Sequence, residues 1–361
     1  MRSVSSERRV KGILPTTPIG LSVDFGTAYE LVLGLRMFVD ADEAPTSYSL
    51  GPDWFERTRE RLPAAALEAI ERYSGGHEIL FGYLLALAAD APAPRDAQTL
   101  IGALDQLPAE EVRRLLLGHR LETYRGGVPR ETIAAAAEGD VVAARELLDG
   151  CLEWQRAPYE HVLGSDGGEM KRLLARSFQG WYDTVLAPEE RTTGRLLKRS
   201  ALATRALAAQ LPAEEVVDVA TRGIRYLPEP GIRRILLVPH VVSRPWSIFT
   251  ELGDTKIVCY GLLDSQVSGD APPDPIVAAY KALGDETRLR LLRRLAMGPA
   301  TLQELTELTG LAKSTVHGHL LVLRTGGLVV ADVSKKTGYR LRRETIAESA
   351  ALLDSYLGTE E

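Results

Sequence analysis

The stretch LAKSTVHGHLLVLRTGGLV, residues 311–329, decides the fold of the C-terminal part of this chain. Its apolar residues recur with the period of a helix. Those that share one side are Val316, Leu320 and Leu323. Because residues i and i+2 lie about 200° apart on a helix, we do not expect His317 and His319 alone to form a metal site. We therefore predict that His319 borders the core beside Val316 and that His317 faces outward.

Local signals on both sides of this helix predict a winged helix-turn-helix. TLQELTEL predicts a preceding helix, and Gly310 stands at the corner, where glycine is common. Further upstream, IVAAYKALGDETRLRLLRRLAMGP predicts two helices, the second with Leu289, Leu292 and Leu295 turned inward. Downstream, LVVADVSKKTGYRLRRE predicts two strands around a basic tip.

These segments resemble the ArsR/SmtB family of bacterial transcription regulators. The resemblance rests on ALGDETRLRLLRRL, LTGLAKSTVHGHLLVLRTGGLV and the basic hairpin, and covers residues 275–344. It implies a module that binds double-stranded DNA. TIAESAALLDSYL resembles the last helix of the family, which implies a homodimer held by the recurring residues Ile346, Ala350, Leu353 and Leu357. The preceding part resembles only longer members that have an uncharacterised helical domain upstream.

The outward side of the recognition helix supplies the candidate contacts with a DNA groove. These residues are Lys313, Ser314, Thr315, His317, Gly318 and Leu321. The candidate phosphate contacts are the nearby cations Arg324, Lys335, Lys336 and Arg340, with Arg342 and Arg343 beyond them. Twelve Lys and Arg face six Asp and Glu between residues 276 and 344, whereas the whole chain has a net charge of −6. This asymmetry is typical of a basic module for a polyanion, attached to an acidic partner domain.

The part before this module is predicted to be mainly helical. IGLSVDF near residue 19 predicts a strand, and helical patterns then continue to about residue 229. Three β-rich runs follow, IRRILLVPHVV, PWSIFTEL and TKIVCYGLL, which we interpret as a β meander over about 232–263. We expect an α+β, mainly α protein with a sensory or interaction domain at 1–265, a linker at 266–275 and the winged module with its dimerisation helix at 276–361.

The motifs that could indicate a metal site, a cofactor site or an enzyme each lack a required residue. The family's thiol-sensor position falls in LQELTEL, which has no Cys, and the last helix has no His, so we predict no metal and no cofactor. HEILF at His77 begins like HExxH but has Phe81 where the second ligand should stand. GSDGGEM at Gly164 lacks the lysine that holds nucleotide phosphates. We therefore expect a protein that is not an enzyme.

The expected function is that of a transcription regulator, with repression as the family's usual mode. It would bind an inverted-repeat operator as a homodimer, and its N-terminal domain would sense a non-metal effector or a protein partner. Aromatic residues could line an apolar pocket there: Trp54, Phe81, Tyr83, Trp154, Trp181, Tyr182 and Trp246. Two alternatives remain, a winged module that mediates protein contacts and a fused enzyme domain under winged-helix control.

The expected location is the cytoplasm. Only two cysteines, Cys151 and Cys259, are present and they are far apart, which fits a reducing compartment. The N-terminal stretch is basic but has no apolar core of a signal peptide. Apolar runs stop well short of the roughly 18 residues that span a bilayer, so we expect no membrane partner.

Overall fold

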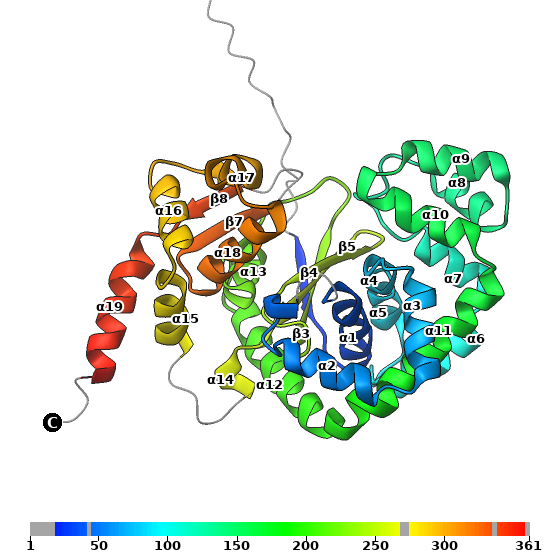
Figure 1. The fold of residues 1–361 in the computed structure, drawn as a ribbon, viewed down its shortest axis with the longest axis horizontal. Coiled ribbons are helices and arrows are strands. Elements are labelled where there is room, and N and C mark those ends of the chain that lie inside the picture. Colours follow the sequence, from blue (N-terminus) through cyan, green and yellow to red (C-terminus); the bar gives the residue numbers. More distant parts are fainter. Residues whose placement is uncertain (1–18, 42–44, 268–273, 334–337, 358–361) are drawn as a thin grey trace, which may run out of the picture.

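The computed structural model describes residues 19–41, 45–267, 274–333 and 338–357. Helices pack around a small mixed sheet, and a second sheet belongs to the C-terminal module (Figure 1). The predicted α+β, mainly α class is confirmed. The helices of the N-terminal region are α1 (Thr27–Asp40), α2 (Pro52–Arg61), α3 (Ala64–Ser74), α4 (Ile79–Gly82), α5 (Leu85–Asp90), α6 (Ala97–Gln106), α7 (Ala109–Leu116), α8 (Arg130–Ala137), α9 (Val141–Gly150), α10 (Arg156–Gly164), α11 (Gly167–Trp181), α12 (Glu190–Ala208), α13 (Ala213–Thr221) and α14 (Asp264–Val267).

Short helical turns connect several of these helices. Three are 3₁₀ turns: η1 (Pro45–Ser47), η2 (Glu153–Gln155) and η4 (Ala187–Glu189). Between α11 and η4 the chain forms a π-helical segment, η3 (Tyr182–Leu186). Such segments are rare and often occur at functional sites.

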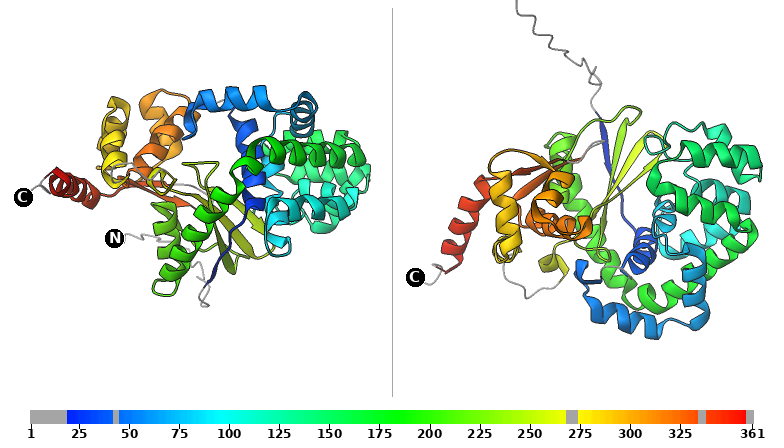
Figure 2. Two further views of the ribbon diagram at one scale, coloured as in Figure 1. Left: turned by 90° about the horizontal axis from the view of Figure 1, so that it is seen from below. Right: turned by 45° about the horizontal axis from the view of Figure 1, so that its top comes forward.

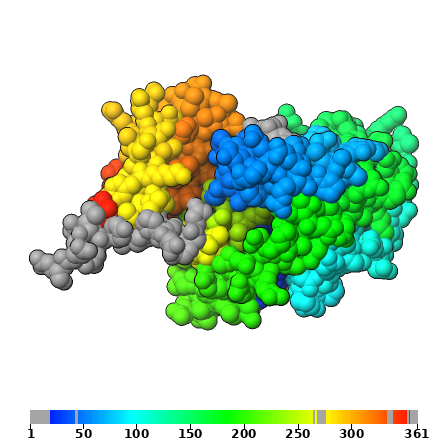
Figure 3. Space-filling model, turned by 60° about the horizontal axis from the view of Figure 1, so that its bottom comes forward, coloured from blue at the N-terminus to red at the C-terminus, as the bar shows by residue number. Residues whose placement is uncertain are grey.

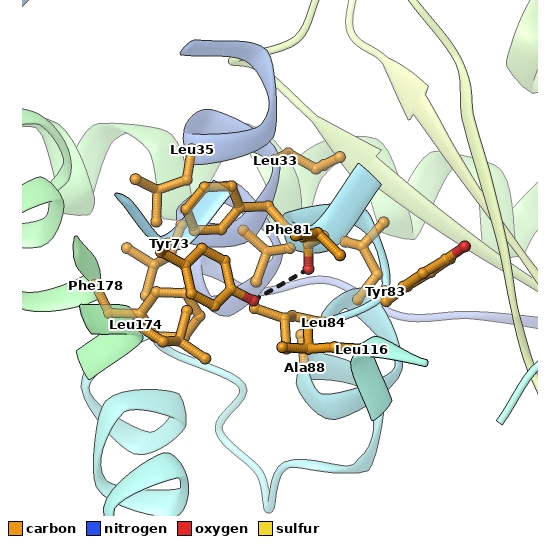
Figure 4. Close-up of a cluster of buried hydrophobic side chains, with 14 of the residues drawn as sticks. Leu33, Leu35, Tyr73, Phe81, Tyr83, Leu84, Ala88, Leu116, Leu174 and Phe178 are labelled. Atoms are coloured by element: carbon orange, nitrogen blue, oxygen red, sulfur yellow. Dashed lines mark hydrogen bonds between the residues drawn. The ribbon is translucent and has the colours of Figure 1, made fainter. Parts of the chain in front are cut away.

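Helix α1 is the centre of the N-terminal core. Its sequence TAYELVLGLRMFVD is apolar almost all round, and a helix of that kind must be buried on every side. Residues from α3, α4, α5, α7 and α11 pack with it in one continuous cluster (Figure 4). Within that cluster the Tyr73 hydroxyl donates a hydrogen bond to the carbonyl of Leu80. Each fully buried aliphatic or aromatic side chain contributes about 1.5–3 kcal/mol.

The N-terminal sheet has the strand order β1-β3-β5-β4, with β1 (Gly20–Val23), β3 (Arg234–His240), β4 (Ile248–Leu252) and β5 (Thr255–Gly261). Alternate residues of its strands face opposite layers. Ile257 and Cys259 join the cluster around α1, whereas Val258 and Tyr260 join a second cluster with α12 and α13. The sheet is therefore a middle layer with helices on both faces.

The predicted β meander is wrong in its connectivity. All three predicted strands form, but β3 pairs in parallel with β5 and with β1, and only β4 and β5 form an antiparallel hairpin. The strand near residue 20 completes this sheet across more than 200 residues of sequence. Alternation of apolar residues reveals a strand but not its neighbours, so the order could not be predicted from local pattern.

The C-terminal module contains α15 (Asp274–Leu283), α16 (Glu286–Leu295), α17 (Leu302–Thr309), α18 (Lys313–Thr325) and α19 (Glu344–Leu357). Its sheet has the order β2-β7-β8-β6, with β2 (Ile224–Tyr226), β6 (Ala300–Thr301), β7 (Val329–Val333) and β8 (Gly338–Leu341). The predicted inner side of α16 needs one correction. Leu291, Leu292 and Leu295 are buried, whereas Leu289 is exposed.

The N-terminal region contributes one strand to the sheet of the module. β2, which follows α13, pairs in parallel with β7, so that Ile224 lies opposite Ala331. This strand covers an edge of the winged sheet that would otherwise present unpaired backbone groups. The proposed linker at 266–275 stays a prediction, and residues 268–273 lie outside the described ranges. Backbone hydrogen bonds between β2 and β7 join the N-terminal region to the C-terminal module.

Candidate nucleic-acid interface

Local sequence signals build the helix-turn-helix itself. Thr301 and Glu304 form a reciprocal capping box at the start of α17, in which the Thr301 N–H donates to the Glu304 carboxylate at 2.7 Å. The helix ends at Gly310, whose φ of 69° is a left-handed conformation that glycine adopts without strain. α18 begins three residues later and buries Val316, Leu320 and Leu323, as its helical phase predicts.

The second histidine lies at the border of this core. His319 Nδ1 is 3.7 Å from Asp285 Oδ1, and its side chain is mostly covered. Asp285 also caps α16, because it accepts a hydrogen bond from the N–H of Arg288. That hydrogen bond, aided by the Arg288 charge, lowers the pKa of Asp285. The predicted position of His319 is therefore confirmed.

The first turn of the recognition helix is exposed. Lys313, Ser314 and Thr315 all lie at the surface, and Gly318 is half-buried with open space where a Cβ would stand. In helix-turn-helix proteins the N-terminal residues of this helix contact base edges. The exposed position of this turn fits such a role. Lys313, Ser314, Thr315 and Gly318 therefore stay candidate DNA contacts.

The C-terminal half of the same helix is covered by the N-terminal region. Arg324 is buried and its guanidinium donates a hydrogen bond to the carbonyl of Thr221 at the end of α13. Burial, with the charge of Arg222 nearby, lowers the pKa of Arg324 to about 10. Leu321 is also buried. The prediction that Arg324 and Leu321 are available to DNA is thus wrong, because both side chains are buried and the end of α13 packs over Arg324.

His317 lies at the boundary between the exposed and covered halves. It is exposed on one side, while its ring centre is 5.3 Å from the ring of Trp246 in the loop after β3. Partial loss of solvent, with the charges of Arg324 and Lys313, lowers the pKa of His317. Figure 2 and Figure 3 show the blue segment around α2 meeting the orange helices of the module on this side of the molecule.

The wing is only partly described. Lys335 and Lys336 lie outside the described residues, so their predicted contacts stay predictions. Arg340 Nε is 3.0 Å from Asp332 Oδ2, and the other carboxylate oxygen of Asp332 is 2.9 Å from Arg225 of β2. Two cations therefore share one carboxylate, and their combined charge exceeds what Asp332 neutralises.

The two cations beyond the wing act within the protein. Arg342 forms an ion pair with Asp218 of α13 at 3.1 Å, and Arg343 donates to the carbonyl of Ala296. The first of these contacts borders a cavity of about 550 Å³ between α13, α15 and α19. The cavity lies at the junction of the two parts, where Arg222 also contributes to its wall.

The helix predicted to hold a dimer presents apolar residues at the surface. Ile346 and Ala350 are exposed, Leu353 is half-buried, and the side chain of Leu357 lies outside the described set. α15, which packs against α19, adds exposed Val277 and Tyr280. Apolar side chains at the surface of neighbouring helices are a feature of subunit interfaces.

Among the described residues, no group of three His, Cys, Asp or Glu has the geometry of a metal site. His77 and His161 form a pair, with ring centres 6.1 Å apart. The sequence did not predict that Thr221, Arg222 and Trp246 lie next to the recognition helix. Thr221 and Trp246 each lie more than 70 residues from the residue that they contact in the recognition helix, and no local signal indicates such a contact.

The order of helices, the exposed turn of α18 and the β7–β8 hairpin define a winged helix-turn-helix, a class of DNA-binding module. Residues 285–330 match the family model described as "Bacterial regulatory protein, arsR family". The C-terminal module is therefore an ArsR-family helix-turn-helix, and the chain is a DNA-binding transcriptional regulator.

Solved structures of regulators are similar to about a quarter of this chain. One is a possible transcriptional regulatory protein from Mycobacterium bovis, with 30% identity over 23% of this chain and 91% of that chain, at a TM-score of 0.20. Another is a possible transcriptional regulator for arsenical resistance, with 30% identity over 24% and 85%, at a TM-score of 0.20. HlyU from Vibrio cholerae has 29% identity over 23% and 92%, at a TM-score of 0.19. A comparison with curated proteins found no match.

Proposed function

We propose that the protein is a cytoplasmic repressor that binds an inverted-repeat operator as a homodimer and responds to a non-metal effector or partner through its N-terminal region. The observation that carries the DNA-binding part is the exposed first turn of α18, set in a module with an excess of six positive charges. A dimer would place two such turns about one helical repeat apart on a palindromic site.

The dimer is supported by the exposed apolar residues on α15 and α19. Tyr280 and Ile346 keep 41% and 44% of their surface exposed in the single chain, and a second protomer that covered them would remove this apolar surface from water. Regulation by the N-terminal region is supported by the packing of Thr221 and Trp246 against the recognition helix. In the part of the chain that the structure describes, every helix is too short or too polar to cross a bilayer.

Selection of sequences from a random DNA duplex pool tests this function. We expect the full-length protein, at low salt, to enrich a palindromic motif with half-sites about one turn apart. Enrichment of a single half-site would contradict the dimer. Failure to enrich any sequence with protein shown to be folded would favour the alternative, a winged module that contacts proteins. The covered side of α18 gives that alternative its specific support, because this side already serves as a protein contact within the chain.

A further inference from the structure

A second cavity lies wholly within the N-terminal region. Its volume is about 340 Å³, and α1, α2, the end of α11, segment η3 and the loop after β3 form its walls. Small-molecule sites usually have volumes of about 300–1,000 Å³ and combine apolar walls with a few polar groups. This cavity has that combination, and a π-helical segment forms part of its wall.

One polar group of the cavity is a fully buried carboxylate. Glu30 belongs to the central helix α1 and accepts hydrogen bonds from the N–H groups of Val241 and Val242, at 2.6 Å and 3.0 Å. Burial raises the pKa of Glu30 to about 7 against the opposing effect of these two donors and of the Arg244 charge. Each carboxylate oxygen has more than one lone pair, so the group can accept further hydrogen bonds. A bound cation would offset the cost of burying its charge.

Aromatic walls adjoin this carboxylate. Trp54 and Trp181 both line the cavity, with ring centres 6.3 Å apart in an edge-to-face arrangement. Indole faces attract ammonium groups, most strongly where water is excluded. A Cβ on Gly34 would lie 2.7 Å from Nε1 of Trp181, so this glycine allows the indole to approach α1 closely.

The charges that line the cavity favour a cation. Glu30 and Glu189 are negative once ionised, whereas Arg61 is positive and already donates a hydrogen bond to the carbonyl of Thr184. The remaining polar residues in its wall are two threonines, Thr58 and Thr193. An anionic ligand would have to approach a buried carboxylate, which is costly in a medium of low dielectric constant.

We propose that this cavity binds a small organic cation, with an ammonium group at Glu30 and an apolar body against Trp54 and Trp181. This inference rests on the proposed function, because it supplies the chemical class of the effector. No metal ion is needed, since the ammonium group itself is the donor to the carboxylate.

The same loop connects the cavity with the recognition helix. Val241 and Val242, held by Glu30, precede Trp246 in the loop between β3 and β4. The Trp246 indole donates a hydrogen bond to the carbonyl of Ser47, and its ring meets His317. An ammonium group bound at Glu30 would alter the hydrogen bonds that hold this loop, and Trp246 would transmit the change to α18.

Thermal unfolding of the full chain at pH 8 tests the site, because Glu30 is mainly ionised there. The probes are phenethylamine and tryptamine, and the matched neutral probes are phenethyl alcohol and tryptophol. A ligand that binds the native state raises the Tm by mass action. We expect the amines to raise the Tm and the alcohols to raise it much less. E30Q should weaken amine binding by about tenfold or more, because a charge-assisted hydrogen bond is removed.

A second variant keeps the test valid if E30Q does not fold. W54L removes an aromatic wall at a half-buried position, whereas W154L changes an exposed tryptophan outside this cavity. We expect W54L to weaken amine binding and W154L to leave it unchanged. Equal binding of amines and alcohols, no binding of either amine, or unchanged amine binding in W54L would overturn the site.

Affinity for the selected operator, with and without amine, tests the connection to DNA. We expect bound amine to change the operator affinity of the normal chain and to have no effect on E30Q or W54L. Amine binding without any change in operator affinity would overturn the connection. Operator binding in the absence of amine tests the proposed function by itself, so the two failures are distinguishable.

Discussion

The ring of Trp246 lies 5.3 Å from the ring of His317, and this contact joins the N-terminal region to the recognition helix. Trp246 follows strand β3, whereas His317 is in the middle of α18. His317 stays exposed on one side of this contact. A change in the loop at 241–247 would therefore reach the middle of the recognition helix through this contact.

W246A is expected to increase operator affinity by about fivefold. An aromatic contact of this kind contributes about 1 kcal/mol, and its removal lowers the cost of freeing α18 by that amount. Fluorescence anisotropy with a labelled operator measures the change. W154A, which truncates an exposed tryptophan, is the matched control and should leave the affinity unchanged. Unchanged or weaker binding by folded W246A would show that DNA binding does not require this contact to open.

Lysines at the exposed turn and the wing are expected to determine the salt dependence of DNA binding. Changing Lys313, Lys335 and Lys336 together to Ala should lower the slope of log K against log salt by about one unit for each phosphate that these lysines neutralise. Titrations at several salt concentrations give this slope. An unchanged slope would remove these lysines from the interface.

Arg324 should behave in the opposite way to those lysines. R324A removes the buried hydrogen bond to Thr221 and is expected to lower the free energy of unfolding by about 1.5–3 kcal/mol. R343A removes an exposed arginine of the same module and serves as the control in urea denaturation. An R324A protein that is as stable as the control but has a flatter salt slope would return Arg324 to the DNA interface.

An aspartate at the surface of α19 is expected to separate the protomers. I346D places a charge where the proposed dimer buries apolar surface, and analytical ultracentrifugation should show a shift from dimer to monomer. L202D makes the same change at an exposed leucine of α12, outside α15 and α19, and should stay dimeric. Dimers of equal strength in both variants would place the interface elsewhere.

Glu30 gives the stability a defined dependence on pH. Burial raises its pKa from 4.5 to about 7 in the folded chain, so the folded state binds more protons than the unfolded state between these values. The unfolding free energy of the normal chain therefore decreases relative to that of E30Q as pH rises from 4.5 to 7. This relative decrease amounts to about 3 kcal/mol and stays constant above the folded-state pKa.

The comparison with E30Q isolates this effect from other buried groups. Burial lowers the pKa of His240 to about 3, which acts on stability in the opposite direction below pH 6.5. That contribution is present in both proteins and cancels in the difference. Urea denaturation of both proteins at several pH values measures the difference in unfolding free energy between the normal chain and E30Q. A difference that does not change with pH would show that Glu30 titrates normally.

Local sequence patterns determined the winged module in most of its detail. The capping box at Thr301, the turn at Gly310 and the helical phase of Val316 each depend on residues within one or two turns of each other. For the same reason the exposed first turn of α18 and the half-buried position of His319 were predictable. On α16, by contrast, the pattern predicts that Leu289 faces inward, whereas this side chain is exposed.

Tertiary structure alone decided what covers those elements. The burial of Arg324 by Thr221, the contact of His317 with Trp246 and the pairing of β2 with β7 connect residues far apart in the sequence. A periodic apolar pattern shows which side of a helix faces its own core. It does not show whether water, DNA or another domain contacts the opposite side. The sequence by itself therefore determined a DNA-binding module, whereas the packing of the N-terminal region determined which part of that module is exposed.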